Sequence, residues 1–160
     1  MDEIEKERQR ADAEERELVF DAFTNDDALA LGLAIVERAR ERRLAVAIDI
    51  ERSGQRLFHF AAEGTSPDND AWIERKKNLV KRVFRSSYSV GLKLRAQQRT
   101  IEEALGIADA EYAAHGGCFP VLVKGVGFVG TVTVSGLPQK DDHDLVVESI
   151  RAFLAARRER

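Results

Sequence analysis

The stretch SPDNDAWIERKKNLVKR, residues 66–82, predicts an amphipathic helix, over about residues 70–87, that must pack against the rest of the chain. Turn residues open it, and apolar residues then recur at helical spacing, at Trp72, Ile73, Leu79, Val80, Val83 and Phe84. At about 100° per residue these side chains form one stripe along the helix. Lys76 lies near the middle of that stripe, and Ser87 follows on the same line. The core-facing surface of this helix therefore carries an ammonium group.

The ammonium group of Lys76 admits three explanations. Its aliphatic stem can pack while the charge reaches water, or the charge can form a buried ion pair with a carboxylate. In the third explanation, the lysine is a binding group that faces a cavity or a subunit interface. Removing an unpaired ammonium from water costs several kcal/mol, which is on the order of the stability of a small domain. We therefore expect water, a carboxylate or an anionic ligand opposite Lys76.

The segments on both sides of this helix predict two hairpins. LAVAIDI (44–50) is mostly apolar on both faces, as in a covered strand, and RLFHFAAEG (56–64) is its returning partner after the turn at Ser53-Gly54. CFPVLV (118–123) and FVGTVTVS (128–135) form the second pair. VGLKLR, residues 90–95, could supply a fifth strand.

Helices are predicted before, between and after these hairpins. The first follows the capping residues TNDD (24–27), and the last begins near DDHD (141–144). Two short helices, IEEAL (101–105) and AEYAAH (110–115), end at glycines. This order predicts an α+β domain, with a sheet of four to five strands and helices on both faces.

The composition is that of an ordinary folded domain. The 160 residues are 44% hydrophobic and 33% charged, which suffices for one domain with a core. A net charge of −3 argues against a nucleic-acid partner. The single cysteine, Cys118, excludes an intrachain disulfide, and no apolar run reaches the roughly 18 residues of a membrane helix. Together with the polar start MDEIEKERQR, these features predict a cytoplasmic protein without a membrane partner.

The chain is predicted to divide into a charged helical arm, residues 1–22, and a single domain, residues 23–160. Residues 1–17 are almost all charged or alanine, so the arm can form a helix but has little surface to bury. We expect either a solvated helix with frayed ends or an arm laid on a neighbouring subunit.

A glycine-rich stretch, GVGFVG (125–130), matches the G-x-G-x-x-G pattern of dinucleotide-binding proteins. In those proteins the glycines lie between a strand and a helix whose N-terminus meets the pyrophosphate. Here the following segment alternates like a strand and has no helical period. These glycines are therefore interpreted as a hairpin turn and a bulge.

The stretch AHGGCFP, residues 114–120, predicts a tight corner. Gly116-Gly117 ends a helix and lets the backbone come close to another group. His115 precedes the corner and is either a helix-capping histidine or a member of a site. His115 and Cys118 alone do not make a zinc site, which needs three or four ligands, so no metal is predicted.

The stretch TVTVSGLPQKDDHD, residues 131–144, joins a row of hydroxyl groups to a helix start. Thr131, Thr133 and Ser135 share one face of their strand. Free N–H groups at the following helix start favour an anion or an acidic cap such as Asp142. No nucleophile motif of the G-x-S-x-G or H-E-x-x-H type accompanies these residues.

Together, SPDNDAWIERKKNLVKR, FRSSYSVG, HGGCFPVLV and TVTVSGLPQKDDHDLVVE resemble the haem-degrading-domain family, in a branch related to HbpS and GlcG. The resemblance spans about residues 25–155. It implies a profilin-like α/β/α fold, with a central antiparallel sheet between helices, and assembly into dimers and larger rings. The motif residues of the branch fall here on Asn69, Trp72, Arg75, Lys76, Asn78, Ser86, Ser87, His115, Gly116, Gly117, Phe119, Pro120, Ser135, Gly136, Asp142 and His143.

The family pattern suggests a site in which distant segments converge. We expect the helix to lie over the sheet near the strand ends, so that Lys76 and Arg75 meet Asp142 or a bound anion. In a dimer, part of this pocket could come from the neighbouring subunit. Further donors would come from Asn69, Ser87, Ser135 and His115.

Three functions follow as hypotheses. The first is a homo-oligomeric binding or assembly module that holds a small anionic metabolite or haem near a subunit interface. The second is a small-molecule enzyme, with haem degradation as one such reaction, that uses His115 or His143 for proton transfer. The third is a scaffold whose polar signature residues lock an interface. Haem rests on the resemblance alone, because no axial ligand can be chosen among His59, His115 and His143.

Overall fold

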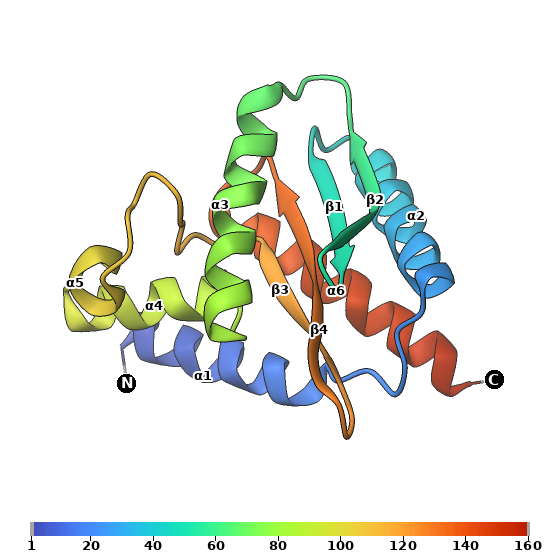
Figure 1. The fold of residues 1–160 in the computed structure, drawn as a ribbon. Helices are drawn as coiled ribbons and strands as arrows, with labels where there is room; N and C mark the ends of the chain where they lie inside the picture. The colour runs from blue at the N-terminus through green and yellow to red at the C-terminus, as the bar shows by residue number, and fades with distance from the viewer. Residues whose placement is uncertain (1, 160) are drawn as a thin grey trace.

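The computed structural model describes residues 2–159, which fold into helices around one sheet (Figure 1). In chain order the elements are α1 (Glu3–Glu17), α2 (Asn25–Glu41), β1 (Ala47–Arg52), β2 (Gln55–Ala61), α3 (Pro67–Val83), α4 (Ser87–Gln97), α5 (Ile101–Leu105), β3 (Cys118–Val123), β4 (Gly127–Ser135) and α6 (Gln139–Arg158). Two expectations are wrong. Residues 90–95 lie inside α4 and form no fifth strand, and residues 110–115 form a turn and irregular chain rather than a helix.

The four strands form an antiparallel sheet in the order β2-β1-β4-β3. The two predicted hairpins join because β1 pairs with β4 along its whole length, from Ala47 opposite Ser135 to Arg52 opposite Gly130. Helices α2 and α6 cover one face of the sheet, and α3 covers the other (Figure 1). The predicted α+β architecture, with a central antiparallel sheet between helices, is confirmed.

The first two glycines of the G-x-G-x-x-G stretch shape the turn between β3 and β4, and the third, Gly130, lies inside β4. Gly125 and Gly127 have φ angles of 74° and 102°, which favour glycine over residues with a side chain. Because β4 follows directly, no helix N-terminus is present to meet a pyrophosphate. The interpretation of this stretch as a hairpin turn is confirmed.

The main apolar core lies between the sheet and helices α2 and α6. Alternate strand residues point into it, and Ile48, Ile50 and Val132 are at most 1% exposed. On α2, Leu31 and Ile35 lie one turn apart and pack into the same core. On this face, an apolar helix stripe therefore packs against apolar strand residues, as in most folded domains.

The sheet face under α3 is equally closed to water but polar. The strand register places Asp49 opposite Thr133 and Glu51 opposite Thr131, so these four side chains share that face. All four are buried. The polar layer extends to Ser135, the next residue of the same row, which completes the predicted row of hydroxyl groups.

Helix α3 presents two lysines to this polar face. Ser66 and Asn69 form its capping box, which fixes where the helix begins. Its buried side includes Ile73, Lys76 and Lys77, at the i, i+3 and i+4 spacing of one helix face. The sequence pattern identified Lys76 as a core-facing charge but missed Lys77.

Helix α1 packs along α4 on its own chain (Figure 1). Glu14 and Glu15 are 4% and 7% exposed, and Glu15 accepts a hydrogen bond from the backbone N–H of Ser86 at 2.7 Å. After α1, Phe20 is buried and bridges to Val123 at the end of β3. The expectation of a solvated helix with frayed ends is therefore wrong, and a contact of this arm with a neighbouring subunit remains a prediction. The division between residues 22 and 23 remains a prediction.

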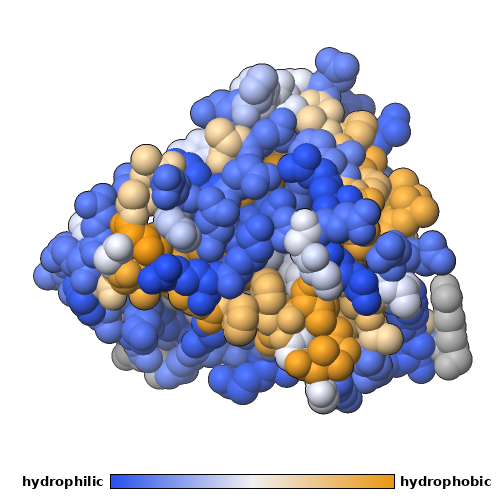
Figure 2. Space-filling model, viewed as in Figure 1, coloured by the Kyte–Doolittle hydropathy of each residue, from blue (hydrophilic) through white to orange (hydrophobic). Residues whose placement is uncertain are grey.

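Apolar side chains reach the surface in limited areas. Figure 2 shows them over the β3–β4 hairpin at the lower end and beside α2 and β2 at the right. The large exposed ones are Leu29, Leu33, Phe60, Phe84 and Val126. Within residues 2–159, no helix combines the length and the apolar character needed to cross a bilayer.

Candidate functional site

The side chain of Lys76 runs from α3 to the end of β4, where it enters a buried ion pair. Its Nζ donates to Asp142 Oδ2 at 3.2 Å and to the carbonyl oxygen of Val134 at 3.1 Å. Lys76 is 3% exposed and Asp142 is 2% exposed. The ammonium group therefore has a carboxylate opposite it and does not snorkel to the surface.

Asp142 lies at the start of α6, where backbone N–H groups orient it. Its carboxylate accepts from the N–H of Leu137 at 2.9 Å and from the N–H of Gly136 at 3.3 Å. Burial raises the pKa of Asp142 to about 6, although Lys76 and both N–H groups act in the opposite direction. Burial also lowers the pKa of Lys76 against the attraction of Asp142. Each charge is thus held in a place that disfavours its ionised form.

The corner at residues 115–120 closes over this ion pair through Gly117. Its φ angle of 134° lies in the region that favours glycine. A Cβ atom at this position would lie 2.4 Å from the carbonyl oxygen of Val134 and 2.7 Å from Lys76 Nζ. Only glycine therefore lets the corner come this close to the ammonium group.

A cavity of about 270 Å³ opens beside the ion pair, where β4 leads into α6. It is lined by Asp68, Asn69, Trp72, Lys76, His115, Ser135, Gly136, Leu137, Gln139 and Asp142. The lining brings together the first half of α3, the corner at His115 and the turn before α6. These are the three segments that the sequence pattern expects to converge.

Trp72 and His115 face each other on this cavity. Their ring centroids are 5.3 Å apart, with the rings at 73° in an edge-to-face arrangement. Partial burial lowers the pKa of His115, and the positive charges of Lys76 and Arg75 lower it further. The imidazole is therefore neutral at pH 7 and can accept a proton or a hydrogen bond.

Arg75 does not meet Asp142, contrary to one expectation. Its guanidinium donates to the carbonyl oxygen of Asp109 at 2.6 and 3.1 Å, and it lies 4.3 Å from the centroid of the Trp72 ring. Asn78 likewise donates to the carbonyl oxygen of Glu111 at 2.9 Å. Both side chains therefore fasten the irregular segment after α5 onto α3.

The remaining motif residues lie outside the cavity. Ser86 caps α4, and Ser87 accepts a hydrogen bond from the N–H of Cys118 at 3.1 Å. Phe119 points to the opposite sheet face and joins the apolar core, as the alternation along β3 requires. Gly116 donates its N–H to Gln139 Oε1 at 3.0 Å. The structure therefore gives these residues packing and capping contacts apart from the ion pair.

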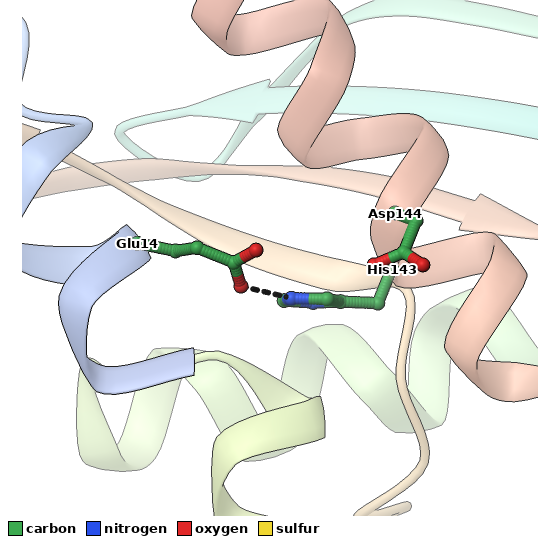
Figure 3. A group of neighbouring side chains, drawn as sticks. All are labelled: Glu14, His143 and Asp144. Atoms are coloured by element: carbon green, nitrogen blue, oxygen red, sulfur yellow. Dashed lines mark hydrogen bonds and ion pairs between the residues drawn. The ribbon is translucent and has the colours of Figure 1, made fainter. Parts of the chain in front are cut away.

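His143 belongs to the contact between α1 and α6 (Figure 3). Its Nε2 lies 2.7 Å from Glu14 Oε1, and its ring stacks on Tyr88 with the centroids 4.5 Å apart. His143 is fully buried and does not line the Lys76 cavity. His59 is also engaged, with ring nitrogens 3.3 Å from Asp49 and 3.1 Å from Asp70. Among the three candidate histidines, His115 is the one on the cavity.

Glu14, His143 and Asp144 lie close enough together to hold a metal ion (Figure 3). However, the Arg10 guanidinium contacts both carboxylates, at 3.1 Å from Glu14 and 3.2 Å from Asp144. A cation at this place would have to compete with a permanent positive charge. We interpret the cluster as a structural contact that holds α1 against α6.

Sequence reasoning missed the second charged group under α3. Lys77 Nζ lies 3.0 Å from Asp49 and 3.2 Å from Glu51, and both carboxylates are buried. Burial opposes the charge, but Asp49, Glu51 and Glu74 together raise the pKa of Lys77. The available signals were the position of Lys77 one turn after Ile73 and a carboxylate inside the apolar stretch LAVAIDI. Among the cavity residues, Asp68, Leu137 and Gln139 were also missed.

Comparisons with known proteins give a consistent result. A family model described as haem degrading protein HbpS-like matches residues 23–151. A UPF0303 protein of Streptomyces coelicolor is 59% identical over 141 residues, which cover 88% of this chain and 89% of the relative. The crystal structure of Ybr137w protein is similar, with 33% identity, a TM-score of 0.87 and coverage of 94% of this chain and 88% of that chain. The crystal structure of HbpS shares the fold, with 23% identity, a TM-score of 0.64 and coverage of 82% and 89%.

Proposed function

The chain belongs to the family of HbpS-like haem degrading proteins, and within it we propose a binding module that holds a small anionic metabolite at Lys76. The observation that supports this proposal most directly is the hydrogen bonding of the ammonium group. Lys76 has three N–H donors, and the described residues accept hydrogen bonds from it at two atoms. The third donor is available to an acceptor in the cavity. A carboxylate oxygen suits it, because hydrogen bonds between charged partners are the strong ones.

Other cavity residues can hold the same anion. Asn69 uses its Oδ1 to cap α3, so its amide NH₂ is available as a donor. The hydroxyl of Ser135 is a further donor on the lining, and Trp72 offers a flat apolar wall. A ligand with a carboxylate at one end and a short carbon body fits this distribution.

The carboxylates of the lining do not prevent an anion from binding. Asp142 is neutralised by Lys76 at 3.2 Å. Asp68 is exposed, so water and salt screen its charge. The guanidinium of Arg75 lies over the Trp72 ring and is paired with the exposed carboxylate of Asp109 at 3.5 Å. The attraction for a small anion therefore comes from the third N–H donor of Lys76 and not from an excess of positive charge.

A haem group does not fit this cavity within one chain. Pockets for drug-sized ligands occupy roughly 300–1,000 Å³. The cavity beside Lys76 measures about 270 Å³. Of the three histidines, His59 and His143 are engaged by carboxylates, which leaves His115 as a candidate axial ligand. A haem macrocycle is larger than the cavity beside Lys76, so we derive no step that involves haem.

We further propose that the protein is a homo-oligomer. Leu29 and Leu33 are 49% and 54% exposed one turn apart on α2, and Phe60 is 40% exposed on β2, at the edge of the sheet. Exposed apolar side chains beside an unpaired strand edge are typical of protein–protein contacts. They support an interface between copies along α2 and β2.

His115 supports a second candidate function, that of a small-molecule enzyme. A neutral imidazole on the lining can take a proton from a bound acid or alcohol. His143 does not support this role, because it is bonded to Glu14 away from the cavity. Replacement of His115 by glutamine would abolish turnover under the enzyme hypothesis and leave metabolite binding within about threefold under the binding hypothesis.

Native mass spectrometry of the purified protein tests the proposal first, because it reports both the number of subunits and any retained small molecule. Calorimetric titration with two- to four-carbon carboxylates then measures binding directly. The informative variant is Lys76→Met/Asp142→Asn, which removes both charges and keeps an oxygen for the N–H groups of Gly136 and Leu137. The matched control is Lys124→Met, on the exposed β3–β4 hairpin.

We expect the double variant to lose carboxylate binding by at least tenfold while Lys124→Met binds normally. Equal binding by the wild type and the double variant would overturn the proposed site. A haem titration that produces a Soret band in the wild type, and none in His115→Ala, would replace the anionic metabolite by haem as the ligand.

A further inference from the structure

A second cavity lies between α1, α4 and α5, which are grouped at the lower left of Figure 1. Its volume is about 340 Å³, and it shares no lining residue with the Lys76 cavity. It is lined by Arg8, Asp12, Val83, Arg85, Ser89, Val90, Lys93, Leu94, Gln97, Arg99, Ala104 and Leu105. We call it the α4 cleft, because five of its twelve lining residues belong to that helix.

The apolar part of the α4 cleft belongs to a small core of its own. Leu94 is buried in a cluster with Leu79, Ile101 and Ile107, and Val90 and Leu105 are partly buried against that cluster. The partly buried members leave apolar surface open to the cleft. An apolar body placed there would lose its contact with water, which stabilises binding.

The polar part of the lining is strongly basic. It holds Arg8, Arg85, Lys93 and Arg99 against one acidic residue, Asp12, although the whole chain carries a net charge of −3. Such a concentration of one sign in a cleft attracts ligands of the opposite sign.

Only part of this positive charge is neutralised by acidic side chains. Arg85 is paired with Asp12 at 2.6 Å and with Glu15 at 3.0 Å, so it contributes little net charge. In contrast, Arg99 donates to a backbone carbonyl, and Lys93 is exposed without an ion-pair partner within residues 2–159. Arg8 has one exposed partner, Glu5, at 3.4 Å.

We propose that the α4 cleft binds an organic anion with an apolar body, of the medium-chain or aromatic monocarboxylate class. The carboxylate lies among Arg8, Lys93 and Arg99, and the carbon body covers the open side of the cluster around Leu94. The volume is at the lower end of the range for drug-sized ligands, which restricts the body to a short chain or a single ring. This site is independent of the function proposed for Lys76.

Calorimetric titration with octanoate at low ionic strength tests the proposal, with 1-octanol as the uncharged probe of equal chain length. We expect octanoate to bind saturably and at least fivefold more tightly than 1-octanol. Raising the salt concentration from about 20 mM to about 200 mM should weaken octanoate binding, because it screens exposed charges. Equal affinities for the two probes, or no saturable binding of octanoate, would overturn the proposal.

Variants separate this cleft from the Lys76 cavity, which could also take a carboxylate. Lys93→Gln/Arg99→Gln should weaken octanoate binding at least fivefold, whereas Lys124→Gln, on the remote hairpin, should not change it. In Lys76→Met/Asp142→Asn, octanoate binding at the α4 cleft should persist. If octanoate binding is lost in that variant and kept in Lys93→Gln/Arg99→Gln, the ligand occupies the Lys76 cavity and the α4 cleft proposal is wrong.

Discussion

The two faces of the sheet are built from alternate residues of the same strands, yet they bury different chemistry. Along β1, Ile48 and Ile50 point to α2 and α6, whereas Asp49 and Glu51 point to α3. All four are closed to water, so the difference between the faces is not one of exposure. One face is held by apolar burial, which has no directional requirement, and the other by charges that each need a placed partner.

This difference indicates a division of roles between the faces. Apolar burial supplies most of the free energy that favours folding, whereas the attraction within a buried ion pair roughly offsets the desolvation of its charges. The polar face therefore adds specificity of position more than stability. It fixes where α3 lies, and it leaves one ammonium group, that of Lys76, beside a cavity. The loss of stability on substitution should then depend on the volume removed at the apolar face and on the charge left without a partner at the polar face.

The largest effect is expected at Lys77, where the polar face would be broken. Lys77→Ala removes the partner that the buried carboxylates of Asp49 and Glu51 share, while Arg56 at 2.8 Å and Lys81 at 3.2 Å stay beside them. A buried charge left with no partner costs about 3–5 kcal/mol, so we expect a loss of up to that size. Urea unfolding followed by circular dichroism measures the loss. The control Lys124→Ala removes an exposed lysine paired with Asp21, and surface pairs contribute about 0–1 kcal/mol. Similar losses in both variants would show that Arg56 and Lys81 suffice as partners and that Lys77 does not hold the polar face together.

The next effect tests the apolar face. Ile48→Ala removes a fully buried side chain and should cost about 2–5 kcal/mol, whereas Ile48→Val should cost about 0.5–1.5 kcal/mol. The cost should follow the volume removed, because no polar group is left unpaired on this face. The same unfolding measurement checks it. If Ile48→Val destabilises as much as Ile48→Ala, the removed volume does not determine the loss of stability on the apolar face. The proposed contrast between the two faces would then be wrong for the apolar face.

A smaller effect is expected in the pH dependence of stability. The pKa of Asp142 is raised from 3.8 in the unfolded chain to about 6 in the fold. The folded state therefore binds more protons than the unfolded state between pH 4 and 6. The stabilisation from this group is fully present below pH 4 and is lost as the pH rises through 6. The full loss is about 3 kcal/mol, because the shift is about two pKa units and one unit corresponds to about 1.4 kcal/mol, and about 2 kcal/mol of it falls between pH 4 and pH 7.

The measurement for Asp142 is a difference between two proteins. The free energy of unfolding of the wild type minus that of Asp142→Asn should fall by about 2 kcal/mol from pH 4 to pH 7. Other acidic groups titrate alike in both proteins and cancel in the difference. A difference that stays constant, or that rises with pH, would show that the buried pair does not disfavour the ionised carboxylate.

The contrast between the faces also explains how much of the molecule could be predicted from the sequence. Both hairpins and the main helices follow from local signals, such as the turn at Ser53-Gly54 and the capping box at Ser66 and Asn69. Lys76 was found because it interrupts an apolar stripe. Lys77 was not, because its partners Asp49 and Glu51 depend on the packing of α3 across β1, which no local pattern specifies.

The same limit explains the error at the N-terminus. Residues 1–17 contain little apolar surface, and the sequence indicated a helix without a docking face. The structure docks α1 with charged residues instead, because Glu14 reaches His143 and Glu15 reaches Arg85 and the N–H of Ser86. Each partner lies on an element that is distant in the sequence. Buried polar contacts of this kind carry no periodic signal.

The smallest effect is expected when both charges of the Lys76 pair are removed together. Lys76→Met keeps the length of the stem, and Asp142→Asn keeps an oxygen for the N–H groups of Gly136 and Leu137. Since a buried ion pair and an uncharged replacement are often close in free energy, the double variant should unfold within about 1 kcal/mol of the wild type. Lys76→Met alone should be less stable than the double variant, because it leaves Asp142 buried without its partner. The coupling energy between Lys76 and Asp142 is then measured by the full double-mutant cycle.

A loss of several kcal/mol in the double variant, with no further loss in Lys76→Met, would mean that the ion pair itself stabilises the fold. In that case the polar face contributes to folding as the apolar face does, and its charges need no ligand to explain them.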